Sequence, residues 1–170
     1  MKIGVLSDSH HKNEYLKECI EFLKKENCEY LIHAGDICSK DGLDILKDSN
    51  LKYIAVFGNN VRDLFQFAQD YNIKKRPYEF KREDKSIKLM HLPFHLHPDT
   101  DIIIFGHTHK FDCEYKNKKL FINPGEVCAR ENPIISCAKL EINTNEYIIT
   151  HYFKNTNENN FMKEEFRYEQ

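Results

Sequence analysis

DIIIFGHTH, residues 101–109, has a run of four apolar residues after Asp101, turns at Gly106 and then presents His107 and His109. A run that is apolar throughout, rather than alternating with polar residues, is typical of a buried strand in a parallel sheet. Open α/β sheets bind their ligands at the carboxyl ends of such strands, and a glycine lets the backbone turn there. The two imidazoles are therefore candidate metal ligands, and ordinary polar loop residues are the alternative interpretation.

Five predicted strand ends deliver polar residues of this kind, and most of them stand beside a glycine. These residues are Asp8 and His10, Asp36, Asn59, His91, and His107 and His109. If the strand ends share one edge of the sheet, seven oxygen and nitrogen ligands converge, which is enough for two divalent cations bridged by one carboxylate. Aspartate and histidine without thiolate suit manganese, iron, zinc, nickel or cobalt. Helix capping is the alternative role for the two aspartates.

Length and composition predict a single globular domain. The chain has 170 residues, 41% hydrophobic and 31% charged, with a formal net charge of −2. This charge offers no basic surface for nucleic acid or an anionic membrane, so we expect neither as a partner. The residues after Met1 do not resemble a secretion signal, and no run is long enough to cross a bilayer. The 6 cysteines include no C-x-x-C pair, which favours reduced thiols and a cytoplasmic location.

The first half of the chain predicts three strand–loop–helix units, and hence parallel strands joined by right-handed crossovers. The strands are 2–7, 30–34 and 52–57. The helices are 13–25, capped by Asn13, a short one from Asp41, and 61–71, with Leu64, Phe65 and Ala68 facing inward. Exposed aromatic residues such as Phe65, Phe67 and Tyr71 would permit a homodimer or a larger homo-oligomer.

The second half is strand-rich. Predicted hairpins pair 78–82 with 86–90, 112–115 with 120–122, and 134–142 with 146–153. Residues 154–170 are almost all polar, and we expect a loosely held tail with one helical turn. The domain organisation is therefore a domain over 1–153 followed by the tail 154–170.

The motifs D-x-H, G-D, G-N-N, a lone histidine after a strand and G-H-T-H, in this order, resemble the calcineurin-like metallophosphoesterases. The likeness is greatest to their small single-domain phosphodiesterase branch, since residues 123–126 are similar to that branch's N-P-G loop; a plain structural turn is the alternative. The resemblance covers residues 1–153. It implies an α/β fold of two facing mixed β-sheets flanked by helices, a four-layer αββα sandwich.

The resemblance also implies a ligand set and a reaction. Two divalent metal ions would bind, with manganese preferred and nickel, iron, zinc or cobalt as alternatives. The first ion would be held by Asp8, His10, Asp36 and His109. The second would be held by Asp36, Asn59, His91 and His107, with Asp36 bridging. A metal-bridging hydroxide would attack the phosphorus of a phosphodiester, and the catalytic residues would be Asp36, Asn59, Asn60 and His91.

The chain departs from the family at two places. Asn60 stands where many members carry a histidine that protonates the leaving oxygen, so we expect a preference for good leaving groups or an acid supplied by His11 or His95. Leu92 and Pro93 replace the glycine that usually follows the lone histidine. His95 or His97 would be an alternative to His91 as the ligand.

Two other functions compete with a phosphodiesterase. A binding scaffold, like the retromer subunit that has this fold, would keep a little-used metal site, and a nucleotide pyrophosphatase would share the metals but differ in its pocket. All seven ligand positions are filled, which favours an enzyme acting on a small phosphodiester or nucleotide. Arg130 would contact phosphate or be a plain solvent arginine, and His151 is expected on a solvated strand face.

Overall fold

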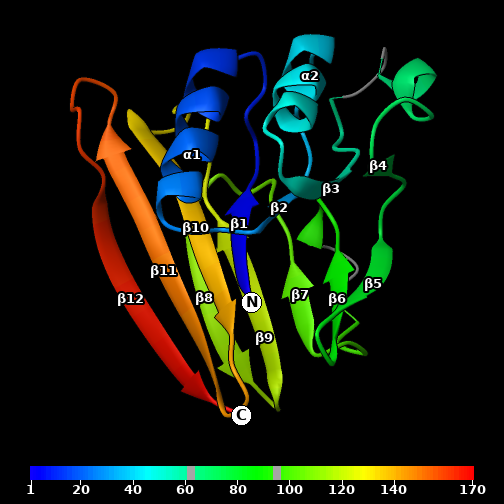
Figure 1. The fold of residues 1–170 in the computed structure, drawn as a ribbon, viewed down its shortest axis with the longest axis vertical. Helices are drawn as coiled ribbons and strands as arrows, with labels where there is room; N and C mark the ends of the chain where they lie inside the picture. The colour runs from blue at the N-terminus through cyan, green and yellow to red at the C-terminus, as the bar shows by residue number, and fades with distance from the viewer. Residues whose placement is uncertain (61–63, 94–96) are drawn as a thin grey trace.

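A computed structural model describes residues 1–60, 64–93 and 97–170 and consists of two mixed sheets that face each other (Figure 1). The larger sheet has the order β12 (Met162–Glu169), β11 (Glu146–Asn155), β10 (Ile134–Ile142), β1 (Lys2–Leu6), β2 (Tyr30–His33), β3 (Lys52–Val56), β4 (Ile73–Lys74). The smaller sheet has the order β5 (Tyr78–Arg82), β6 (Lys85–Leu89), β7 (Ile102–Ile104), β9 (Lys119–Pro124), β8 (Phe111–Lys116). The prediction of two facing mixed sheets is confirmed.

Each sheet has a parallel centre. Strands β1 to β4 run parallel in the larger sheet, and β6, β7 and β9 run parallel in the smaller one. The predicted parallel strand of residues 102–104 is therefore confirmed. Its side chains alternate between two buried surfaces: Ile102 and Ile104 join the core between the sheets, whereas Ile103 packs with Met90 and Phe105 on the other face. Burial on both faces explains the uninterrupted apolar run.

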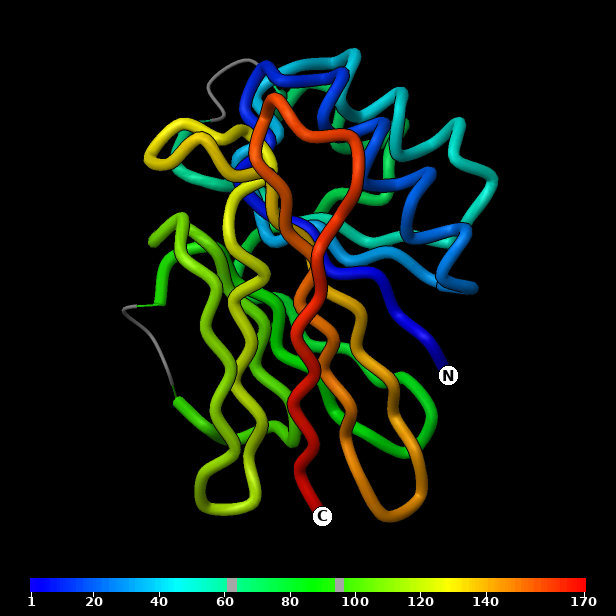
Figure 2. The backbone as a smooth tube through the Cα atoms, turned by 90° about the vertical axis from the view of Figure 1, so that its left-hand side faces the viewer, coloured from blue at the N-terminus to red at the C-terminus, as the bar shows by residue number. Residues whose placement is uncertain are grey.

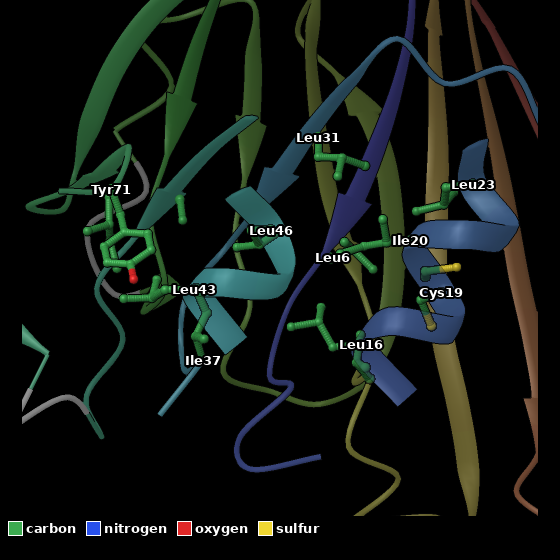
Figure 3. Close-up of a cluster of buried hydrophobic side chains, with 14 of the residues drawn as sticks. Leu6, Leu16, Cys19, Ile20, Leu23, Leu31, Ile37, Leu43, Leu46 and Tyr71 are labelled. Atoms are coloured by element: carbon green, nitrogen blue, oxygen red, sulfur yellow. The ribbon is translucent and has the colours of Figure 1, made fainter. Parts of the chain in front are cut away.

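Both α-helices pack on the outer face of the larger sheet (Figure 1). In α1 (Asn13–Lys25), Leu16, Ile20 and Leu23 repeat at helical spacing and meet Leu6 and Leu31 of the sheet (Figure 3). In α2 (Lys40–Asp48), the first turn is capped by the Ser39 hydroxyl, which accepts a hydrogen bond from the Gly42 amide. Among the described residues no α-helix covers the outer face of the smaller sheet. On that side the described part of the chain therefore lacks the helical layer of the predicted αββα sandwich.

The expected loose tail is wrong, because β12 pairs with β11 along its whole length and closes one edge of the sandwich. Figure 2 shows this last strand running between the β8–β9 hairpin and β11. The Phe166 ring lies 5.5 Å from that of Phe111, and the Tyr168 hydroxyl donates to the Cys113 carbonyl at 3.0 Å. The many charged residues of β12 hid the strand in the sequence, yet charge is what protects an edge strand from pairing with another chain.

The predicted third helix is also wrong where it can be examined. Residues 61–63 lie outside the described part, and the rest forms only a short 3-10 turn, η1 (Phe65–Phe67), before β4. Leu64 is buried as predicted, but Phe65 is 52% exposed. Asn13 does not cap α1; its side-chain oxygen accepts from the Ser39 hydroxyl instead.

All six cysteines are free, as predicted. Within residues 1–60, 64–93 and 97–170, no helix is long and apolar enough to cross a bilayer.

Candidate active site

The loops that follow five strands meet at one edge of the sandwich. Asp8, Asp36 and Asn59 follow the neighbouring strands β1, β2 and β3, while His91 follows β6 and the G-H-T-H loop follows β7. The structure brings all seven predicted ligands into one chain of contacts, each 3.9 Å or shorter.

Asp8 and His109 form the more deeply buried half of this site. Asp8 Oδ1 lies 3.4 Å from His109 Nε2 and 3.9 Å from His91 Nε2. The other oxygen, Oδ2, accepts from the Ser7 hydroxyl at 2.6 Å and from the His107 backbone amide at 3.0 Å. One oxygen is thus fixed by the protein while the other points into the site.

Asn59 is the centre of the second half. Its Oδ1 lies 2.9 Å from His91 Nε2 and 3.1 Å from His107 Nδ1. His91 Nδ1 donates to the Ala34 carbonyl at 2.8 Å, so the lone pair of its Nε2 faces the site. An amide oxygen and imidazole lone pairs therefore converge, which is an arrangement that a cation stabilises.

Asp36 lies between the two halves. Its Oδ2 is 3.9 Å from His10 Nε2 and 3.5 Å from His91 Nε2. Asn60 holds the carboxylate in place, donating from its backbone amide to Oδ1 at 3.0 Å and from its side chain to Oδ2 at 2.6 Å. Burial alone would raise the pKa of Asp36, but the close approach of the His91 ring and the two hydrogen bonds from Asn60 outweigh it and lower that pKa.

The four imidazoles form two pairs. The rings of His10 and His109 stack with centroids 5.4 Å apart, and those of His91 and His107 meet edge to face at 5.2 Å. Burial lowers the pKa of both His10 and His107, and the neighbouring His91 lowers that of His107 further. Both rings are therefore neutral near pH 7, which is the form that binds a metal.

Two buried polar atoms of the site have no hydrogen-bond partner, Asp8 Oδ1 and His10 Nε2. Both are ligand atoms in the predicted set. A buried acceptor without a partner costs free energy unless a bound group, such as a cation, satisfies it. Asp8, Asp36 and His91 also offer three atoms within 4.8 Å of one another. The residues present therefore fit divalent cations.

The backbone of the site is strained. Asp8, His10, Asp36, His107 and His109 all have φ between 46° and 68°, the left-handed region that residues other than glycine rarely adopt. Such strain persists only where the surrounding structure imposes it, and it is concentrated at functional sites.

Two glycines let the backbone approach the carboxylates. A Cβ on Gly58 would lie 1.8 Å from Asp36 Oδ1, and one on Gly106 would lie 2.0 Å from the Ser7 hydroxyl and 2.8 Å from Asp8 Oδ2. No other residue type fits at either position.

Glu126 is a functional residue whose role the sequence did not show. Its carboxylate accepts from His109 Nδ1 at 2.6 Å, from the backbone amides of residues 130–132 and from the Cys128 thiol. Burial would raise the pKa of Glu126, but these bonds lower it. The carboxylate therefore fixes the proton of His109 on Nδ1, so that Nε2 carries the lone pair that could bind a cation. Its place directly after the N-P-G loop was the one available signal.

Two thiols also lie beside the imidazoles. The Cys38 sulfur is 3.4 Å from His10 Nδ1, and Cys128 groups with His10 and His109 within 4.8 Å. Burial raises the pKa of each thiol to about 12, with the Asp36 and Asp8 charges adding to the effect at Cys38 and the Glu126 hydrogen bond adding to it at Cys128. Both sulfurs are therefore protonated at neutral pH, and neither belongs to the predicted ligand set.

The remaining candidates differ in where they lie relative to the site. His11 is exposed, and the backbone carbonyl of His97 accepts from Lys88, whereas His91 contacts both Asn59 and Asp36. His95 lies outside the described residues. The guanidinium of Arg130 is 3.1 Å from His109 Nε2, and thus beside the site. His151 is not on a solvated face but stacks on Phe111 with centroids 3.8 Å apart.

Comparison with known proteins gives consistent results. A family profile described as the calcineurin-like phosphoesterase superfamily domain matches residues 1–145. A phosphodiesterase of Methanocaldococcus jannaschii is 30% identical over 164 residues, which cover 86% of this chain and 96% of that protein.

Solved structures agree in fold. That of an archaeal phosphodiesterase has a TM-score of 0.76 and 29% identity, over 86% of this chain and 97% of the other. Vps29 of Chaetomium thermophilum has a TM-score of 0.79 over 100% of this chain and 99% of its own, but only 14% identity, so this likeness concerns the fold alone.

Proposed function

Because this chain belongs to the calcineurin-like phosphoesterase superfamily, whose members are metal-dependent hydrolases, we propose that it hydrolyses small phosphodiesters at a site for two divalent cations. The observation that carries the proposal is the convergence of seven oxygen and nitrogen ligands around the partnerless atoms Asp8 Oδ1 and His10 Nε2. The phosphodiesterase relative supports the substrate class.

We assign Asp8, His10, Asp36 and His109 to one cation and Asp36, Asn59, His91 and His107 to the other. The two ring pairs and the position of Asp36 between them support this division. Bound cations would supply neutralisation of the phosphate charge and a water of lowered pKa. Manganese, a cytoplasmic location and a homodimer stay predictions.

The residues of the chain have distinct roles in this proposal. Asn60 orients Asp36 and cannot donate a proton to the leaving oxygen, so the enzyme should prefer esters with good leaving groups. Arg130, whose guanidinium lies beside the site, would contact the phosphate. A binding scaffold is the second candidate because the fold is shared with Vps29, but the full set of ligand positions favours turnover.

The proposal is tested with bis-p-nitrophenyl phosphate and protein that has been chelated and then reloaded with Mn²⁺. We expect close to two ions per chain by metal analysis and hydrolysis that the His107→Ala variant loses. The matched control is His97→Ala, since that side chain is exposed and outside the site. Absence of bound metal, or full activity in His107→Ala, would contradict the proposal.

A further inference from the structure

The larger sheet is longer than the smaller sheet that faces it. Strands β10 and β11 have 9 and 10 residues, whereas β8 and β9 have 6 each. The end of β9 is fixed against β10 where the Ser136 hydroxyl donates to the Pro124 carbonyl at 2.7 Å. Ile134 lies two residues beyond Ser136 on β10, and Phe153 is paired with Ser136 on β11, so this end of the inner face extends past the end of β9.

A cavity of about 280 Å³ lies at this uncovered end. Its apolar walls are Phe111, Ile134, His151 and Phe153, which we call the aromatic shelf. His151 stacks between the two phenyl rings, with centroids 3.8 Å from Phe111 and 4.8 Å from Phe153. Among the described residues only three large hydrophobic residues are exposed to solvent, and one of them is Ile134, with 36% of its surface accessible.

The aromatic shelf adjoins the candidate active site. His109 and Glu126, the proposed ligand and the carboxylate that orients it, line the same cavity. Of the seven proposed ligands only His109 lines the cavity, so the shelf borders the site on the side of His109 and Glu126.

The shelf is suited to an uncharged group. Because the Ser136 hydroxyl donates to Pro124, its oxygen accepts from His151 Nε2 at 2.8 Å, and burial lowers the pKa of His151 to about 4. The ring is therefore neutral at pH 7. Lys110 and Glu164, which also line the cavity, offset each other in charge, so nothing there selects a second anion.

We propose that the aromatic shelf binds a flat, uncharged ester group of the phosphodiester, an aryl ring or a nucleobase, while the phosphate lies at the metal site; this rests on the proposed function. A ring of this size fits the cavity, and its burial against aromatic and aliphatic side chains is favourable. The shelf would thus distinguish aromatic diesters from small alkyl diesters.

The test compares two phosphonates that are not hydrolysed, phenylphosphonate and methylphosphonate, by calorimetry with the Mn²⁺-loaded protein. Both carry the same anionic head, so their affinity ratio isolates the contribution of the ring. We expect the phenyl compound to bind about tenfold more tightly to the unmodified protein. Ile134→Ser, at an exposed position, and Phe153→Ala should each bring the ratio close to one without changing the affinity for methylphosphonate. The matched control is Phe65→Ser, which removes an exposed phenyl ring elsewhere and should keep the tenfold ratio.

The outcomes separate the two proposals. Equal affinity for both phosphonates in the unmodified protein would overturn the shelf while leaving the proposed function standing. Binding of neither compound would overturn the proposed function and the shelf with it. A methyl resonance of Ile134 that shifts with phenylphosphonate, and not with methylphosphonate, would place the ring on the shelf.

Discussion

The two halves of the site differ in how firmly the fold holds them. In the half of Asp8 and His109, the side chains are 0% and 8% exposed, and Glu126 and Ser7 position them. In the half of Asn59 and His107, Asn59 is exposed and His107 is only partly buried. Asp8 and His109 are thus held in place before a ligand arrives, whereas Asn59 and His107 are accessible to solvent. If two cations bind as proposed, we expect the one held by Asp8 and His109 to exchange more slowly than the other.

The largest effect is expected from Asp36→Asn, because this carboxylate contacts both halves. Loss of its charge should abolish binding of both ions and lower kcat/KM by on the order of 10³-fold. Metal analysis and hydrolysis of bis-p-nitrophenyl phosphate measure the two effects. Asp101→Asn is the control, since Asp101 also accepts hydrogen bonds but does so from Ser86, outside the site.

Glu126→Gln tests the buried half alone. An amide cannot hold His109 Nδ1 and the three backbone amides as the carboxylate does, so affinity for the first ion should fall about 10- to 100-fold. Calorimetric titration with Mn²⁺ measures it, with Glu131→Gln as the control from the same loop. An equal loss of affinity for both ions would show that the two halves of the site are not independent.

Asn59→Ala tests the open half. Since Asn59 is the one proposed ligand that is exposed and it belongs to that half alone, we expect the weaker binding step to disappear and the tighter one to persist. The titration should then show one ion per chain. Loss of both steps would contradict the division of ligands given above.

The smallest effect is expected from Arg130→Ala, and it has the opposite sign. The guanidinium donates to His109 Nε2, the nitrogen that a cation would use, and it must leave when the cation binds. Its removal should raise affinity for the first ion about threefold to tenfold, because a single hydrogen bond is worth roughly 1 kcal/mol. Arg167→Ala, an exposed arginine on β12, is the control. Weaker binding in Arg130→Ala would show that the guanidinium supports the site instead.

Much of the fold was predictable because its central strands carry strong local signals. The apolar runs before Asp8, Asp36 and His107 fixed both the strands and the loops that follow them. Strand β12 was missed because its apolar residues, Phe166 and Tyr168, are few and stand among charges that suit a sheet edge. Their contacts with β8, more than fifty residues earlier, cannot be read from local sequence.

The site was predictable as a set of residues but not in its supporting contacts. Ligand types and their order along the chain identify candidates, since the chemistry needs those side chains. The hydrogen bonds from Asn60 to Asp36 and from His109 to Glu126 depend on how loops from distant strands pack together. No periodicity or composition encodes such a meeting, so these roles emerged only from the three-dimensional arrangement.

The hydrogen bond from the His107 amide to Asp8 spans 99 positions of the chain and joins the loop after β7 of the smaller sheet to the loop after β1 of the larger one. Any cation shared by these loops would hold the two sheets together, because neither loop alone supplies the ligands. The melting temperature should then depend on metal concentration. Each tenfold rise in free metal above the dissociation constant should add about 1.4 kcal/mol to the free energy of unfolding. Chelation of the metal would thus lower the stability of the two-sheet fold as well as abolish hydrolysis.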